Sequence, residues 1–187
     1  MMWKRHHRRA AKARFGALSQ SLLATPLDYI RADHKRQRDF YRAVEDFAEA
    51  DTLDLREAQA IARFISGEEA LHVRDEEEGL FPLLRLKTEP SDDIERVLGL
   101  LSGEHVVDEN EGVKIAEGLR DAIASRATTL DAALRNALRA FTVRKNRHLA
   151  LENAVVLPIA SRRLTSKDLT ALTHSIASRQ AKRPGGR

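Results

Sequence analysis

Three histidines in this sequence are each followed, four residues later, by a glutamate. The pairs are His72 with Glu76, His105 with Glu109, and His148 with Glu152. Residues four apart lie on one face of a helix, so each pair can present an imidazole and a carboxylate to the same point. The chain has no cysteine, which excludes thiolate ligands and iron–sulfur clusters. The remaining ligand types, imidazole and carboxylate, suit iron or manganese.

A fourth histidine, His34, belongs with these pairs because of where it lies. Apolar residues spaced three and four apart predict an inward stripe on each long helix, and each stripe contains one histidine. A single histidine of this kind is usually a hydrogen-bonded core residue. Four together, three with a glutamate beside them, are better explained by a bound metal, because buried charges must be paired or coordinated. His6, His7 and His174 have no such glutamate.

The segments that must position these residues are predicted to be helices. Start signals such as Thr25 followed by Pro26 precede them, and no alternation typical of strands competes. The predicted helices lie near residues 26–49, 54–87, 91–125, 129–160 and 166–180. Their short connections make neighbouring helices antiparallel. We therefore predict an all-α fold: an antiparallel, up-down-up-down four-helix bundle with a short C-terminal fifth helix and a basic N-terminal extension.

The charge pattern divides the chain into three parts. Residues 1–24 form the basic N-terminal extension, 25–162 the bundle, and 163–187 the short C-terminal helix with a basic tail. The net charge is +4, but six Lys or Arg lie within 1–14 and four within 179–187, with no acid in either stretch. The rest of the chain is therefore acidic, at about −6.

The basic N-terminal run is compatible with a targeting signal, a nucleic-acid arm or a solvated tail. The solvated tail is favoured, since no aromatic residues interleave with the cations as they do in nucleic-acid-binding segments. We therefore expect no nucleic-acid partner. No apolar run is long enough to span a bilayer, so we expect a cytoplasmic protein without a membrane partner.

The four histidines are predicted to lie in one layer of the bundle, because the rise is ~1.5 Å per residue. A glutamate in that layer can bridge two metal ions with its two oxygens. Two bridging carboxylates and one oxo or hydroxo group would nearly neutralise two ferrous ions. Four-helix bundles are known hosts of dinuclear carboxylate sites, often with Glu-x-x-His spacing. The order in this chain is His-x-x-x-Glu.

The pattern runs through four segments, of which the first contributes His34 and the other three contain the order His-x-x-x-Glu: DYIRADH (28–34), LHVRDEEEGLFP (71–82), GEHVVDE (103–109) and RHLALENAVVLP (147–158). With them, the chain resembles the hemerythrin-like HHE cation-binding family over residues 25–160. The resemblance implies an antiparallel four-helix bundle around a non-haem di-iron centre. It also implies four terminal imidazole ligands and two bridging carboxylates, which would be His34, His72, His105, His148, Glu76 and Glu152.

The third helix departs from the pattern of oxygen-carrying hemerythrins. Those proteins have two histidines four residues apart on this helix, whereas this chain offers His105, with Leu101 upstream and Glu109 downstream. Glu109 is a candidate iron ligand, a candidate hydrogen-bond partner behind the ligands, or a solvated carboxylate. The missing imidazole favours oxidised iron and open coordination positions, which argues against reversible oxygen transport.

Two glycines, Gly79 and Gly112, lie inside the predicted helices near the histidines. Each costs up to ~1 kcal/mol relative to alanine in a helix. They either leave room for a small ligand or allow two helices to pack closely.

The leading hypothesis is a protein with two iron ions, joined by an oxo or hydroxo bridge, that binds or reacts with oxygen, nitric oxide or peroxide. Its role would be sensing or a stress response. One alternative is an enzyme of iron-centre repair, detoxification or iron handling; another is a metal-free helical interaction module. Whether the chain is an enzyme, which redox partner it uses, whether it is a monomer or a homodimer, and whether manganese or zinc replaces iron are left open by the sequence.

Overall fold

The computed structural model describes residues 18–182. Within this range the chain is helical and contains no strand, which confirms the prediction of an all-α protein. Most of the predicted basic extension, residues 1–17, and the end of the basic tail, 183–187, lie outside the described residues. No helix in the described part of the chain is long and apolar enough to cross a membrane.

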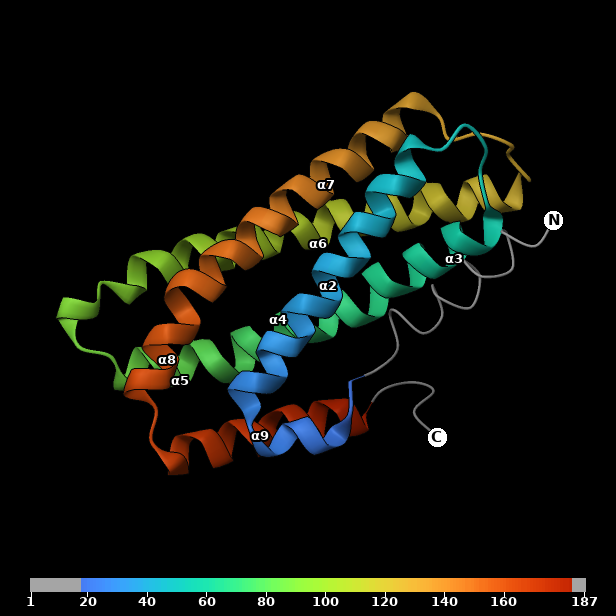
Figure 1. The fold of residues 1–187 in the computed structure, drawn as a ribbon. Helices are drawn as coiled ribbons and strands as arrows, with labels where there is room; N and C mark the ends of the chain where they lie inside the picture. Colours follow the sequence, from blue (N-terminus) through green and yellow to red (C-terminus); the bar gives the residue numbers. More distant parts are fainter. Residues whose placement is uncertain (1–17, 183–187) are drawn as a thin grey trace.

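Four long helical rods lie side by side, and consecutive rods run in opposite directions (Figure 1). The first rod is α2 (Pro26–Glu49) and the third is α6 (Ile94–Ala124). The second rod comprises α3 (Leu55–Phe64), η2 (Ile65–Glu69), α4 (Ala70–Asp75), η3 (Glu76–Leu80) and α5 (Phe81–Lys87). The fourth comprises α7 (Ala132–Leu151), η5 (Glu152–Val156) and α8 (Leu157–Arg163). α2 packs against α7, and α6 packs against both α3 and α7.

Three further helical segments lie outside the rods: η1 (Gln20–Ala24), η4 (Pro90–Asp92) and α9 (Ser166–Ala181). In Figure 1, α9 (red) lies beside η1 (blue) along one edge of the rods. α9 contacts α4 and η3 of the second rod as well as η1. Thr165 and Asp168 form a capping box at its start, which fixes where α9 begins.

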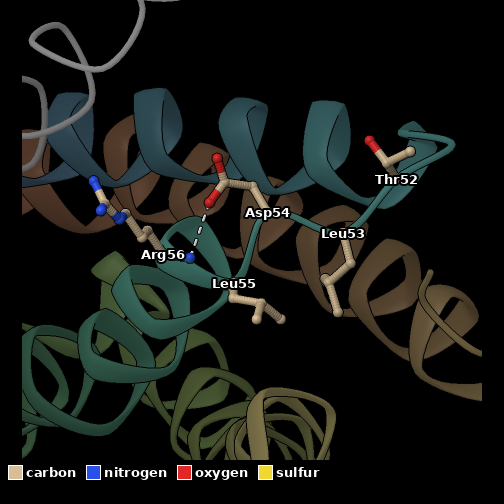
Figure 2. A pocket seen from close by; sticks show the side chains of 5 residues that line it. All are labelled: Thr52, Leu53, Asp54, Leu55 and Arg56. Carbon is tan, nitrogen blue, oxygen red and sulfur yellow. Dashed lines mark hydrogen bonds between the residues drawn. The ribbon is translucent and has the colours of Figure 1, made fainter. Parts of the chain in front are cut away.

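Aspartate caps set the starts of two rods. Asp54 Oδ1 accepts hydrogen bonds from the backbone N–H of Arg56, at 2.9 Å, and of Glu57 (Figure 2). Asp131 caps α7 in the same way, so that helix begins at residue 132 rather than near 129. A hollow beside Asp54 is lined by residues 52–56. It lies about 25 Å along the rod from His72 and therefore does not reach the histidines.

The second and fourth rods are interrupted by π turns, whereas the sequence predicted continuous helices there. η3 begins at Glu76 and η5 begins at Glu152, and each closes with a backbone hydrogen bond spanning five residues, back to that glutamate's carbonyl. Pro82 and Pro158 follow six residues after the respective glutamates. A proline lacks an N–H and crowds the carbonyl four residues earlier, and the wider π turn relieves that conflict.

The buried core consists of two apolar clusters. One contains Phe40, Tyr41 and Phe141, with neighbours from all four rods, and the other contains Leu80, Phe81 and Leu98. We call them the Phe40 cluster and the Phe81 cluster. Buried polar residues, including all four predicted histidines, lie between them along every rod. The interior of the molecule is therefore divided by a polar layer, which is the candidate site.

Candidate metal centre

One histidine from each rod reaches the layer between the two apolar clusters. Each of these side chains is at most 3% exposed. They form two pairs, with ring centroids 5.1 Å apart for His34 and His72 and 4.6 Å apart for His105 and His148. The stripes of apolar residues on each rod bury one face, and the histidines lie on those faces.

Every histidine directs its Nε2 atom at Glu76 or Glu152. Glu76 oxygens lie 3.4 Å from the Nε2 of His34, His72 and His105. Glu152 oxygens lie 3.5 Å from His34 Nε2 and 3.1 Å from His148 Nε2. Both carboxylates are 1% exposed. The two glutamates therefore occupy the centre of a ring of four imidazoles.

Two groups of potential ligand atoms overlap at these glutamates. Within each group the ligand atoms lie within 4.8 Å of one another. The groups are His34, His72, Glu76 and Glu152, and Glu76, His105, His148 and Glu152. Each group thus offers two imidazole nitrogens and two carboxylate oxygens. Because the glutamates belong to both groups, they lie where carboxylates that bridge two ions would lie.

Several of these buried atoms lack a hydrogen bond within the described residues. They are the Nε2 atoms of His34, His72 and His105 and the Oε2 atoms of Glu76 and Glu152. A buried polar atom without a partner costs free energy, so such atoms are rare in folded proteins. Metal ions would supply partners for all five. The residues present therefore fit a dinuclear site with nitrogen and oxygen ligands.

Carboxylates behind three of the histidines hold the other ring nitrogen. His72 Nδ1 lies 3.1 Å from Asp33, His105 Nδ1 lies 2.7 Å from Glu77, and His148 Nδ1 lies 2.9 Å from Glu104. A carboxylate that accepts the Nδ1 proton leaves Nε2 free to bind a metal and makes the imidazole a stronger donor. His34 has no such partner in the described residues.

His72 and Glu76 hold opposite charges beside each other even without metal. Burial lowers the pKa of His72, but Glu76 and Asp33 outweigh burial and raise this pKa to about 10. Burial raises the pKa of Glu76, but the imidazoles of His72 and His105 beside it hold this pKa well below its ordinary value. Metal binding would therefore displace protons from imidazoles that the glutamates now hold charged.

The sequence of the chain decides which family this site belongs to. A sequence model of the hemerythrin HHE cation-binding domain matches residues 25–160, which is most of the chain. The chain belongs to the hemerythrin HHE family. A search of curated proteins found no match to this chain. The family resemblance inferred from four short segments is thereby confirmed over the same residues.

The hemerythrin HHE domain brings together six of the seven residues predicted from sequence as ligands. The seventh, Glu109, is exposed on α6 and belongs to neither ligand group. Its neighbour Asp108 is the buried acid of that turn and accepts a hydrogen bond from Arg144 at 3.0 Å. The α6 helix turns by about 100° per residue, which explains why only one of two adjacent acids faces inward.

The two glycines near the site serve close packing in this hemerythrin HHE domain. A Cβ atom on Gly79 would lie 2.9 Å from Arg179 and 3.1 Å from Leu172, both on α9. A Cβ atom on Gly112 would lie 2.9 Å from Ile65. Of the two explanations that the sequence left open, the structure therefore supports close helix packing.

The three carboxylates behind the histidines were not predicted from sequence, yet each lies next to a predicted ligand in the chain. Asp33 precedes His34, Glu104 precedes His105 and Glu77 follows Glu76. Each holds a histidine on the next rod rather than on its own. An acid adjacent to a predicted ligand was the available signal. Its partner could not be identified until the rods were placed side by side.

Proposed function

We propose that this hemerythrin HHE domain holds two iron ions in the layer between its two apolar clusters. Glu76 and Glu152 would bridge the ions, His34 and His72 would bind one, and His105 and His148 the other. The observation that carries the proposal is the membership of both glutamates in both ligand groups. In our proposal the four rods form the up-down-up-down bundle typical of such centres.

The proposed reaction partner is a small molecule: oxygen, nitric oxide or peroxide. The iron pair would supply electrons and positions for a bound ligand. Two imidazoles and two shared carboxylates per ion leave coordination positions open on six-coordinate iron. The apolar clusters on both sides exclude water, and Asp33, Glu77 and Glu104 orient the imidazoles.

We further propose a cytoplasmic role in sensing or stress response rather than in oxygen transport. α6 contributes one imidazole to the layer, and its downstream acid Glu109 faces away from it. The centre would thus be richer in oxygen ligands than one with a fifth histidine. Oxygen ligands favour oxidised iron, which would bind oxygen less reversibly.

Iron analysis of matched variants tests the proposal. The metal-free chain is loaded with ferrous iron without air, desalted and assayed for iron per chain. The wild-type chain and Glu109→Ala should retain about two ions, whereas Glu152→Ala, which removes a shared ligand, should retain at most about one. Air should then produce the absorption of an oxo-bridged ferric pair in the first two only. Equal iron in Glu152→Ala and wild type would contradict the proposal.

A further inference from the structure

A second buried polar layer lies next to the proposed ligand layer, on the side of the Phe40 cluster. Each rod contributes one residue to this layer, three positions from its histidine. That residue follows the histidine on α2 and α6 and precedes the histidine on the second and fourth rods. We call these residues the outer layer: Gln37, Glu69, Asp108 and Lys145. All are buried, with Gln37 and Lys145 at 0% exposed and the two acids at 6%. The alternating direction of the rods brings them to one level.

Lys145 is the cation of the outer layer. Its Nζ lies 3.1 Å from Glu69 Oε2 and 4.0 Å from Asp108 Oδ2. The two acids also have other donors: the Tyr41 hydroxyl bonds to Glu69, and Arg144 Nε donates to Asp108. These bonds use Glu69 Oε1 and Asp108 Oδ1, so Glu69 Oε2 and Asp108 Oδ2 are the acid oxygens that face Lys145.

The ammonium group of Lys145 is buried and donates no well-aligned hydrogen bond to any described residue. Burial lowers its pKa, but Glu69, Asp108 and Glu152 outweigh burial and raise the pKa above its ordinary value. Lys145 is therefore charged at neutral pH. The charge of Lys145 in turn lowers the pKa of His148, so it acts on the ligand layer.

A buried charge of this kind contributes little to stability by itself. An ion pair in the interior is often replaced by apolar residues without loss, because desolvation offsets the attraction between the charges. The stability of the fold therefore does not explain a lysine here. A buried positive N–H donor without a hydrogen-bonded acceptor among the described residues, one helical turn from His148, is suited to an acceptor that arrives with a ligand.

We propose that Lys145 Nζ donates a hydrogen bond to the outer end of a small anion bound at the metal centre. This inference rests on the proposed di-iron function and deepens it. The site would favour anionic ligands of several atoms, of the peroxide or azide class, over neutral diatomic ligands. A neutral diatomic molecule carries little charge on its outer atom and gains little from an ammonium group.

The test compares two probe ligands, azide and nitric oxide, on iron-loaded protein. Lys145→Met removes the donor and keeps the side-chain length. Thr142→Val on the same helix is the matched control, because Thr142 is also fully buried but bonds only to a backbone carbonyl of its own helix. Lys145→Met by itself would leave the buried Glu69 without its cation. A double variant, Lys145→Met with Glu69→Gln, removes that unpaired charge as well. Iron per chain is measured first, then each ligand's dissociation constant from absorption spectra.

Lys145→Met should raise the azide dissociation constant at least about tenfold, as expected for one hydrogen bond from a charged donor. Nitric oxide affinity should change by less than about threefold, and the Thr142→Val control should bind both probes as the wild type does. The double variant should repeat the azide loss, and it decides the matter if Lys145→Met does not fold.

Two results would overturn the inference while leaving the di-iron function in place. One is unchanged azide affinity in fully iron-loaded Lys145→Met or the double variant. The other is an equal loss of azide and nitric oxide affinity, which would mean that Lys145 only supports the local fold. Failure of the wild-type chain to bind iron would instead overturn the proposed function, and the iron assay identifies that case before any ligand is added.

Discussion

The carboxylates behind the histidines connect each rod to the next. Asp33 on α2 holds His72, Glu77 on η3 holds His105, and Glu104 on α6 holds His148. The backbone that positions one ligand therefore also orients the imidazole of its neighbour. His34 lacks this support, so its ring is held by packing and by the glutamates alone.

Glu104→Gln tests this arrangement at the level of one atom. The amide keeps the size of the side chain but no longer provides a carboxylate for His148 Nδ1. Iron affinity should fall by about 10- to 100-fold, as found when such supporting groups are removed. Competition with a chelator measures the change. The exposed Glu109→Gln should leave affinity unaltered, and an equally small effect of both substitutions would argue against a role for Glu104.

At the residue scale, the spacing of histidine and glutamate, together with the apolar stripe that contains His34, was sufficient to predict the six residues that meet in the layer. Positions four apart share a helix face whatever the rest of the fold does. Glu109 satisfied the same spacing but faces solvent, because Asp108 occupies the inward position. Contacts between rods, such as that of Lys145 with Glu69, depend on tertiary placement and could not be predicted from spacing.

The helices position the site through close contacts at particular glycines. Gly112 on α6 faces Ile65 of the second rod, and Gly103 on the same helix faces open space. Gly112→Leu should therefore destabilise the iron-free chain by about 1–3 kcal/mol through overpacking. Gly103→Leu should stabilise it by up to ~1 kcal/mol through helix propensity. Urea unfolding of both variants measures the difference, and effects of the same sign would contradict this explanation.

The start of α9 links that helix to the second rod through Asp168. Thr165 donates to this carboxylate, and Lys87 Nζ of α5 lies 3.0 Å away. The hydrogen bond from Thr165 and the nearby Lys87 lower the pKa of Asp168 to about 2. The stability contributed by a carboxylate with a lowered pKa is complete above its ordinary pKa of 3.8 and is lost as pH falls through about 2.

Asp168→Asn should therefore lower the stability of the iron-free chain at pH 6. The difference in stability between this variant and the wild type should become smaller between pH 4 and pH 2. Urea midpoints at a series of pH values give this difference directly. Asp121→Asn, at an exposed position of α6, provides the control. A stability difference that stays constant down to pH 2 would show that the carboxylate charge of Asp168 does not stabilise the contact between α9 and α5.

At the element scale, helix positions could be predicted more closely than helix continuity. The predicted segment 26–49 coincides with α2, because Pro26 marks its first turn. The predicted segment 54–87 is a single rod, but two π turns interrupt it. For η3, and for η5 in the fourth rod, the signal was a proline six residues after Glu76 and Glu152, whereas no proline marks η2. The effect of such a proline could have been a kink or a widened turn, and the sequence does not distinguish these.

The molecule as a whole places a charged layer across its own core. The Phe40 and Phe81 clusters hold the ends of the rods together, and the layer between them contains polar atoms without partners. Metal ions would satisfy those atoms only in the folded chain. A metal ion that binds the folded chain but not the unfolded chain raises the free energy of unfolding.

Removing metal should therefore destabilise the protein measurably. At free iron 100-fold above the dissociation constant, the loaded chain should gain about 2.7 kcal/mol in free energy of unfolding for each bound ion over the metal-free chain. Urea unfolding in the presence of ferrous iron or of a chelator compares the two. Glu152→Ala should show a much smaller gain. A loaded wild-type chain no more stable than the metal-free one would mean that iron does not bind the folded layer.

The most direct test of a dinuclear centre is Mössbauer spectroscopy of the wild-type chain loaded with ⁵⁷Fe and oxidised in air. We expect about two ferric ions per chain that are magnetically coupled through a shared bridge, giving a diamagnetic ground state. A spectrum of isolated, uncoupled ferric ions would contradict it, as would iron at one ion per chain or less.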